Sequence, residues 1–260
     1  MKKLTKTLLL VLCAILLVAG SVLGTVAYLT DKQDVTNTFT VGNVQIKLDE
    51  AVVNSESGEK VGDSRTEDGN TAVRLIPGRS ITKDPTVTVL KDSEDCYVRV
   101  KVTVDLPNWT PEAAKLAGWK TDEQDFADAF RNWADNFAAQ YLRHNVHDTT
   151  EHGFNPMDWK LSRTEHNPNA KTITYVLTYK TSDKTNIVRK NIDDNTVLNP
   201  VFDKVVAPTN LTNAQLALLQ GMKIKVEAHA IQAEGFTATG TEGDPDYKTA
   251  EQNAWKEFGD

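Results

Sequence analysis

The chain has 260 residues, 40% of them hydrophobic, and a formal net charge of −7, which suits one large globular domain or two small ones. With 2 cysteines, 14 glycines and 9 prolines, it is neither disulfide-rich nor collagen-like. When Lys2, Lys3 and Lys6 at the N-terminus are set aside, the charge of the remainder falls to −10. This acidic balance disfavours general nucleic-acid binding and docking to anionic lipid.

Residues 1–27 have the form of a secretory signal peptide. The N-terminal lysines precede an apolar run, Leu8–Ala19, and small residues follow it. We expect a signal peptidase to cleave between Ala27 and Tyr28. The alternative is an uncleaved anchor, because about 20 apolar residues span a bilayer and the chain has no charge from Leu8 to Leu29. Both interpretations place residues 31–260 outside the cytoplasm.

The next part of the chain predicts strands separated by polar loops. Residues 34–49 indicate extended structure, with a change of alternation at Gly42 that predicts a bulge or two short strands. Residues 51–70 are rich in Ser, Glu, Gly and Asp and predict a surface loop. Residues 71–106 are the best β region, and their last part alternates strictly between valines and polar residues, which predicts an antiparallel strand with one wet face.

Cys96 opens this last strand and is the only cysteine beyond the signal segment, so no intramolecular disulfide can form there. We expect a buried small side chain, with pairing between two chains as the alternative.

Residues 107–170 predict a helical insertion. A short helix is expected over Pro111–Leu116 and a longer one over 122–143. In the longer helix a stripe of aromatic residues recurs at helical spacing: Phe126, Phe130, Trp133, Phe137 and Tyr141. We expect the stripe to pack onto the sheet rather than to form a carbohydrate or peptide platform. Residues 144–170 predict a loop.

Strand signals return over 173–179 and 222–230. Thr212–Gln215 has the form of a capping box, which opens a short helix that Gly221 closes. A terminal helix near Thr249–Phe258 is expected to bind back to the body. Because half-wet sheets bury their apolar faces against each other, we predict a mostly β fold. The prediction is a jelly-roll-like antiparallel β-sandwich with an inserted helical segment, one secreted domain over residues 28–260.

The chemical motifs are few. The sequence contains no phosphate-binding loop and no GxGxxG, GxSxG, CxxC or HExxH pattern. Four of the five histidines cluster near Glu151: His144, His147, His152 and His166. His144 and His147 would share one face of a helix, a spacing that zinc sites use, but the segment looks loop-like. We therefore predict surface histidines and assign no catalytic, cofactor or metal residue.

Two regions resemble a known family. Gly24–Asp31 followed by Val35–Val44 is similar to the signal-peptide region of exported proteins processed by the SipW-type signal peptidase, the TasA/camelysin-like family. Ile76–Lys101 resembles the sheet core of that family, and Ala228–Ala233 resembles its closing strand.

The resemblance implies a Gram-positive secreted or cell-surface protein with a jelly-roll sandwich. It implies a SipW-type signal peptidase as a partner and self-association into fibres of the biofilm matrix. In such fibres an N-terminal strand of one subunit completes the sheet of the next, and residues 31–49 would be the donor. Membrane contact would be limited to the N-terminal segment before cleavage, with no nucleic-acid partner.

Two other functions stay open. One is a monomeric cell-surface binding module that recognises its ligand through residues 107–170. The other is a camelysin-like metalloendopeptidase, for which the sequence offers no zinc motif.

Overall fold

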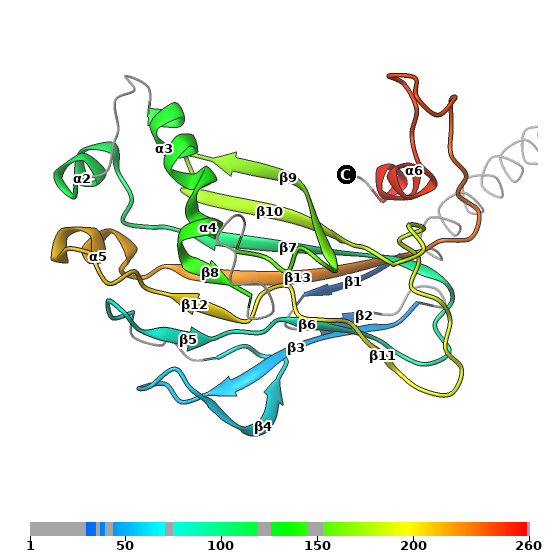
Figure 1. The fold of residues 1–260 in the computed structure, drawn as a ribbon, viewed down its shortest axis with the longest axis horizontal. Helices are drawn as coiled ribbons and strands as arrows, with labels where there is room; N and C mark the ends of the chain where they lie inside the picture. The colour runs from blue at the N-terminus through cyan, green and yellow to red at the C-terminus, as the bar shows by residue number, and fades with distance from the viewer. Residues whose placement is uncertain are drawn as a thin grey trace, which may run out of the picture.

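The computed structural model of the protein describes residues 30–34, 37–39, 44–70, 75–118, 126–144 and 153–258. The predicted signal segment, its Ala27–Tyr28 junction and the predicted bulge at Gly42 lie outside these residues. The described chain is mostly β, and its strands form three antiparallel sheets. The predicted fold class, an antiparallel β-sandwich with an inserted helical segment, is confirmed. Figure 1 shows the largest sheet above the smaller ones, with helices at both ends.

The largest sheet has six strands in the order β2-β1-β13-β7-β10-β9. Its strands are β1 (Thr30–Asp34), β2 (Asn37–Phe39), β7 (Cys96–Asp105), β9 (Trp159–Asn167), β10 (Thr172–Tyr179) and β13 (Lys223–Gln232). β7 pairs with β13 along its whole length and with β10 on its other side. The alternation of apolar and polar residues in the sequence correctly predicted the three central strands, β7, β10 and β13.

The second sheet has four strands in the order β11-β6-β3-β4. They are β3 (Ile46–Val53), β4 (Lys60–Thr66), β6 (Thr86–Val89) and β11 (Thr196–Val197). A small third sheet, β5-β12-β8, consists of β5 (Ser80–Thr82), β8 (Leu142–Arg143) and β12 (Lys204–Val206).

The core lies between the large sheet and the second sheet. From β7 it takes Val98, Val100, Val102 and Val104, all with no exposed surface, and from the second sheet it takes Ile46, Leu48 and Val87. Burial of these apolar faces against each other is the main stabilisation of a domain of this size without disulfides.

The helical insertion covers one end of the sandwich with α2 (Pro111–Leu116), α3 (Phe126–Asp135) and α4 (Phe137–Tyr141). The aromatic stripe packs inward as predicted: the side chains of Phe130, Trp133, Phe137 and Tyr141 are buried. The Tyr175 hydroxyl on β10 donates to the Ala134 carbonyl and accepts from the Ala138 amide, which ties the junction of α3 and α4 to the sheet.

Two further helices begin with capping boxes, of which the sequence predicted the one at Thr212. α5 (Asn213–Leu219) is capped by Thr212 and Gln215, and α6 (Ala250–Glu257) is capped by Thr249 and Gln252. α6 lies at the opposite end of the molecule from α2, α3 and α5 (Figure 1).

Three local predictions are wrong. The segment 51–70 is not one loop, because β3 continues to Val53 and a short connection leads from it to β4 (Lys60–Thr66). The segment 144–170 contains β9, so the helical insertion ends before Trp159. The polar face of β7 is not wet throughout, since Tyr97 and Arg99 are buried and the guanidinium of Arg99 stacks 4.1 Å from the Trp255 ring of α6.

Candidate functional site

The candidate site is one side of β13. β7 lies along the other side of this strand from Lys223 to Gln232. On the near side, β1 pairs only with the second half, from Ala228 to Ile231. Among the described residues, no strand lies beside the first half on this side. We call the side of β13 that faces away from β7, from Lys223 to Val226, the acceptor edge.

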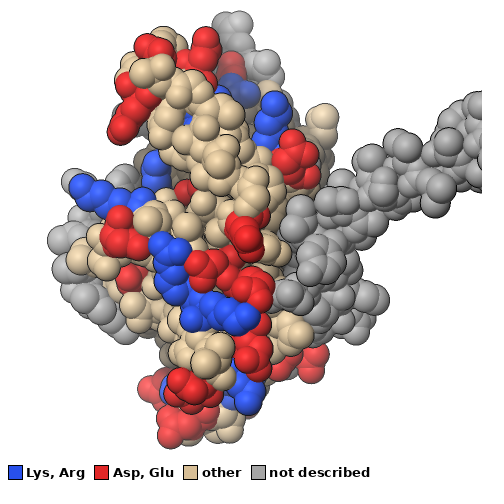
Figure 2. All heavy atoms as spheres, turned by 90° about the vertical axis from the view of Figure 1, so that its right-hand side faces the viewer, with Lys and Arg blue, Asp and Glu red and all other residues tan. Residues whose placement is uncertain are grey.

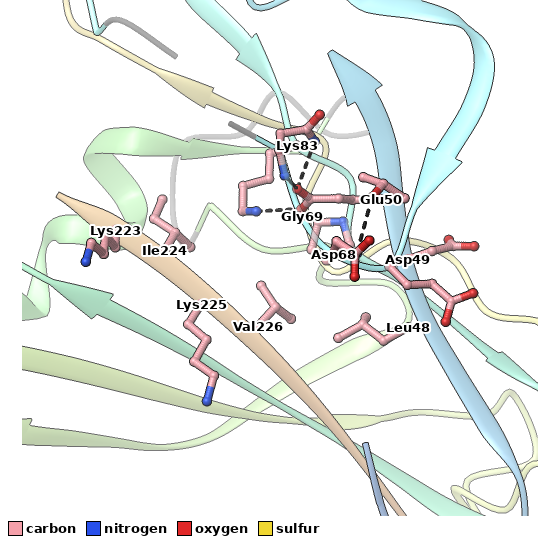
Figure 3. A pocket seen from close by; sticks show the side chains of 14 residues that line it. Leu48, Asp49, Glu50, Asp68, Gly69, Lys83, Lys223, Ile224, Lys225 and Val226 are labelled. Atoms are coloured by element: carbon pink, nitrogen blue, oxygen red, sulfur yellow. Dashed lines mark hydrogen bonds and ion pairs between the residues drawn. The ribbon is translucent and has the colours of Figure 1, made fainter. Parts of the chain in front are cut away.

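The acceptor edge borders a groove. A hollow of about 330 Å³ lies between β13 and β3, lined by Ile224 and Val226 on one wall and Leu48 on the other. Figure 3 shows β13 and β3 on either side of this hollow, with Val226 and Leu48 directed toward each other. A second hollow of about 800 Å³ continues toward α5, β5 and β12. The two hollows share lining residues, Ile224 among them, and therefore form one groove.

The walls of the larger hollow are mainly apolar. Its apolar lining residues are Val53, Leu75, Ile81, Val205, Leu216, Ala217, Leu219, Met222 and Ile224. Among the described residues, a hollow with apolar walls next to a sheet edge is a place where side chains of an added strand can be buried.

A partly buried ion pair lies where the two hollows meet. Glu50 on β3 and Lys83 form it, with 8% and 19% of their side chains exposed. Glu50 also accepts hydrogen bonds from the backbone and side-chain nitrogens of Asn70, at 3.1 and 2.9 Å (Figure 3). The carboxylate thus accepts from three donors, which join Glu50 on β3 to Lys83 and Asn70 at the β3 wall of the groove.

The pairing of β3 with β4 is irregular between Ala51 and Val53. Here side chains, rather than a neighbouring strand, accept hydrogen bonds from the β3 backbone amides. Asp84 accepts from the Ala51 amide at 2.6 Å, and Asn70 accepts from the Val53 amide at 2.8 Å. Arg65 on β4 binds Asp84, with a distance of 2.9 Å from Nη1 to Oδ2.

Arg65 also pairs with Asp49. Burial lowers the pKa of Arg65, but the hydrogen bonds that its guanidinium donates to Asp49 and Asp84 outweigh this effect, so the pKa is raised overall. These charges fix the β3 wall of the groove, and their role is structural.

The predicted histidine cluster is divided in the structure. His144 Nδ1 lies 2.7 Å from Asp203 Oδ2, and His166 Nε2 lies 2.8 Å from Asp135 Oδ1. The prediction of surface histidines is wrong for His144, whose side chain is 6% exposed. The other members of the cluster, His147, Glu151 and His152, lie outside the described residues. No group of three or more His, Cys, Asp or Glu that could hold a metal occurs in the described ranges.

Cys96 is a free, fully buried thiol, as predicted. Burial, with a smaller contribution from the charge of Asp95, raises its pKa to about 12. A protonated, enclosed thiol is neither a good nucleophile nor accessible for pairing with another chain.

The surface charge at one end of the molecule is mixed. Figure 2 shows Lys and Arg interspersed with Asp and Glu on this face, without a broad patch of one sign. Within the described ranges, no helix is long and apolar enough to cross a membrane.

No protein-family model, curated protein or solved structure matches the chain. The resemblance to the TasA/camelysin-like family therefore stays a prediction.

The acceptor edge could not be predicted from the sequence. The alternation of residues 222–230 predicted β13, but which side of a strand carries a neighbour depends on the strand order of the sheet. The sequence predicted a donor strand over residues 31–49 without its acceptor. In the structure residues 46–49 belong to β3 and pair with β6, so the predicted donor is too long at its C-terminal end.

Proposed function

We propose that this chain is a secreted or cell-surface structural protein, a subunit of extracellular matrix fibres that assemble by N-terminal β-strand addition. The observation that supports the proposal best is the acceptor edge beside its apolar groove. A sheet edge without a neighbouring strand is a template for pairing with another chain. Strand addition supplies backbone hydrogen bonds, and alternate side chains of the added strand fill pockets beside the edge.

The same chain carries a matching donor. β1 already pairs antiparallel with β13 from Ala228 to Ile231, on the same side of the strand as the acceptor edge and directly next to it. Exchange of such an element between copies closes the same contacts between molecules instead of within one. Each copy has one donor and one acceptor, so copies can join head-to-tail, and such a contact builds an open fibre when the rotation between neighbouring copies does not close into a ring.

Export is part of the proposal. The signal-like residues 1–27 would direct the chain out of the cell, and cleavage after Ala27 by a SipW-type peptidase would leave the donor segment next to a new N-terminus. Donor and acceptor would then meet only outside the cell, where the fibre is built.

The alternative functions gain less support. The binding-module hypothesis used the aromatic stripe of the insertion, and its described side chains are buried in the core. The metalloendopeptidase hypothesis gains no metal-ligand group from the described residues.

A complementation experiment tests strand exchange. Deletion of residues 30–39 gives an acceptor without a donor and keeps the Ala27–Tyr28 junction. Ile224→Lys places a charge in the groove and gives a donor with a blocked acceptor. Val197→Lys is the matched control, because Val197 is 67% exposed on β11, in the other sheet.

The exported proteins are examined by light scattering and electron microscopy. We expect fibres from the wild type and the control, monomers from each test variant alone, and heterodimers when the two test variants are mixed. A wild-type protein that stays monomeric contradicts the proposal and favours a binding module. Fibres from the variant lacking residues 30–39 show that another segment drives assembly.

A further inference from the structure

Three side chains at the junction of the two hollows are connected by hydrogen bonds that join an amine to a carboxamide. Glu50 on β3 lies in the middle. Its Oε2 accepts from Nζ of Lys83 at 2.5 Å, and its Oε1 accepts from Nδ2 of Asn70 at 2.9 Å. Figure 3 shows Lys83 and Glu50 directed toward each other. One carboxylate therefore contacts both groups that an amide-forming reaction needs, a primary amine and a carboxamide.

The backbone of β3 holds the carboxamide of Asn70 in one orientation. Its Nδ2 also donates to the Ala51 carbonyl at 2.8 Å, and its Oδ1 accepts from the Val53 amide at 2.8 Å. These partners fix which end of the side chain is oxygen and which is nitrogen. The Val53 amide lies where it can stabilise the negative charge that Oδ1 gains when a nucleophile attacks Cγ.

The irregularity of β3 provides these backbone contacts. The pairing of β3 with β4 shifts between Ala51 and Val53, the two residues that bind the Asn70 side chain. Such bulges are over-represented next to active sites, where they redirect groups of the strand.

Low exposure favours the reactive form of the amine. The side chains of Glu50 and Lys83 are 8% and 19% exposed. When a proton moves from Nζ to the carboxylate, two charges with little access to water become a neutral carboxylic acid and a neutral amine. The neutral amine is the nucleophilic form of lysine.

We propose that Lys83 and Asn70 join through an intramolecular isopeptide bond, with Glu50 as the catalytic proton carrier. The inference goes beyond the proposed function and does not depend on fibre assembly. It requires only the contacts within one copy that the described residues make.

The reaction balances without any further reactant. Glu50 takes one proton from the Lys83 ammonium, and the neutral Nζ attacks Cγ of Asn70. Glu50 then gives this proton to Nδ2 and takes a second proton from the attached Nζ. The Cγ–Nδ2 bond breaks as the carbonyl forms again, and Nδ2 leaves as ammonia. The new Nζ–Cγ bond is an amide, and nothing is oxidised or reduced.

The bond ties the segment that follows β4 to the residue that follows β5 and closes a loop over residues 70–83. With Cys96 as the only cysteine beyond the predicted signal segment, an intramolecular disulfide cannot provide such a tie there. The freshly folded chain carries the ion pair, and the linked product is lighter by one ammonia. The stability of each state can therefore be measured separately.

Mass spectrometry of the exported protein, followed over time after folding, tests the proposal. We expect the intact mass of the wild type to fall by one ammonia. Trypsin cleaves after lysine and arginine, but the linked Lys83 is no longer a cleavage site. Peptide 66–74 should therefore be recovered joined to peptide 80–91.

Three variants identify the groups that react. Lys83→Arg keeps the positive charge beside Glu50 but lacks the primary amine, so it should show no linked peptide. Glu50→Gln removes the proton carrier and should slow linkage about 100-fold or more. Lys60→Arg is the matched control, because Lys60 is 43% exposed and pairs with Asp63 on β4, and it should link at the wild-type rate. The linked wild type should unfold roughly 6–12 °C above Lys83→Arg.

The wild-type protein alone can overturn the proposal, whether or not a variant folds. An intact mass that stays unchanged, with peptides 66–74 and 80–83 recovered separately, shows that no bond forms. Loss of water instead of ammonia, with Lys83 joined to Glu50, overturns Asn70 as the partner. Loss of ammonia without the joined peptides places the reaction elsewhere and also overturns it. None of these results affects fibre assembly, which the complementation experiment tests separately.

Discussion

Removal of Lys83 tests whether the charges at the groove hold its wall. Lys83→Met keeps most of the side-chain length and removes the ammonium group that pairs with Glu50. The carboxylate is then left in a site where 8% of its side chain is exposed, and its remaining donors among the described residues are the two nitrogens of Asn70. We expect the free energy of unfolding to fall because a buried charge has lost its counterion.

Breaking a buried ion pair costs about 3–5 kcal/mol. The loss here should lie near the lower end, about 3 kcal/mol, because Asn70 remains bound and the adjoining hollows admit water. For a chain of this size that corresponds to a fall in Tm of roughly 6–12 °C. Adding Glu50→Gln removes the buried charge, and the double variant should return to within about 1 kcal/mol of the wild type.

The assay is urea unfolding followed by tryptophan fluorescence, with linear extrapolation to water. Arg131→Met is the matched control, since the Arg131 and Asp128 side chains are 52% and 53% exposed and their loss should cost less than about 0.5 kcal/mol. A Lys83→Met protein as stable as the control variant would refute the claim that this pair stabilises the wall of the groove.

Three further variants test the packing around the sheets. Trp255→Ala should lower the free energy of unfolding by about 3–5 kcal/mol, because the ring is 2% exposed and stacks with Arg99, whereas exposed Lys256→Ala should be nearly neutral in the same urea assay. Cys96 should resist thiol reagents in the native protein and react after unfolding. Because its folded pKa is raised, its contribution to stability is present below pH 9 and is lost as the pH rises toward 12, and Cys96→Ala should flatten that part of the stability profile. Gly153→Ala should lower the Tm far more than Gly62→Ala, since both have positive φ but only at Gly153 would a Cβ lie 2.1 Å from the Ala138 carbonyl oxygen.

The strands that the sequence predicted are the ones with a buried face. Val98 through Val104 alternate with polar residues because one face of β7 meets the core, and the same holds for β10 and β13. β4 was missed because six of its seven side chains are exposed, so its sequence shows no period of two. β9 was missed for the same reason: it is an edge strand whose polar residues bond across to β10, as Ser162 does to Thr178 at 2.7 Å.

The helix that carries the aromatic stripe differs from its prediction in one detail. The spacing from Phe126 to Tyr141 predicted one helix, whereas the structure ends α3 at Asp135 and starts α4 at Phe137. Asn136 lies at the junction, and its side chain donates back to the Asn132 carbonyl at 3.2 Å. The aromatic spacing survives because a break of one residue keeps the stripe on the same side. The groove, in contrast, depends on strand order and on contacts such as Glu50–Lys83, which are 33 residues apart in the chain.

Amide hydrogen exchange of residues 223–226 tests the central claim most directly. The exported protein is compared as monomer and as assembled material, with β7 amides as an internal reference. We predict that amides on the acceptor edge exchange at least tenfold more slowly after assembly, because a strand of a second copy then lies beside them. Equal exchange rates in monomer and fibre would contradict the claim that β13 receives the donor strand.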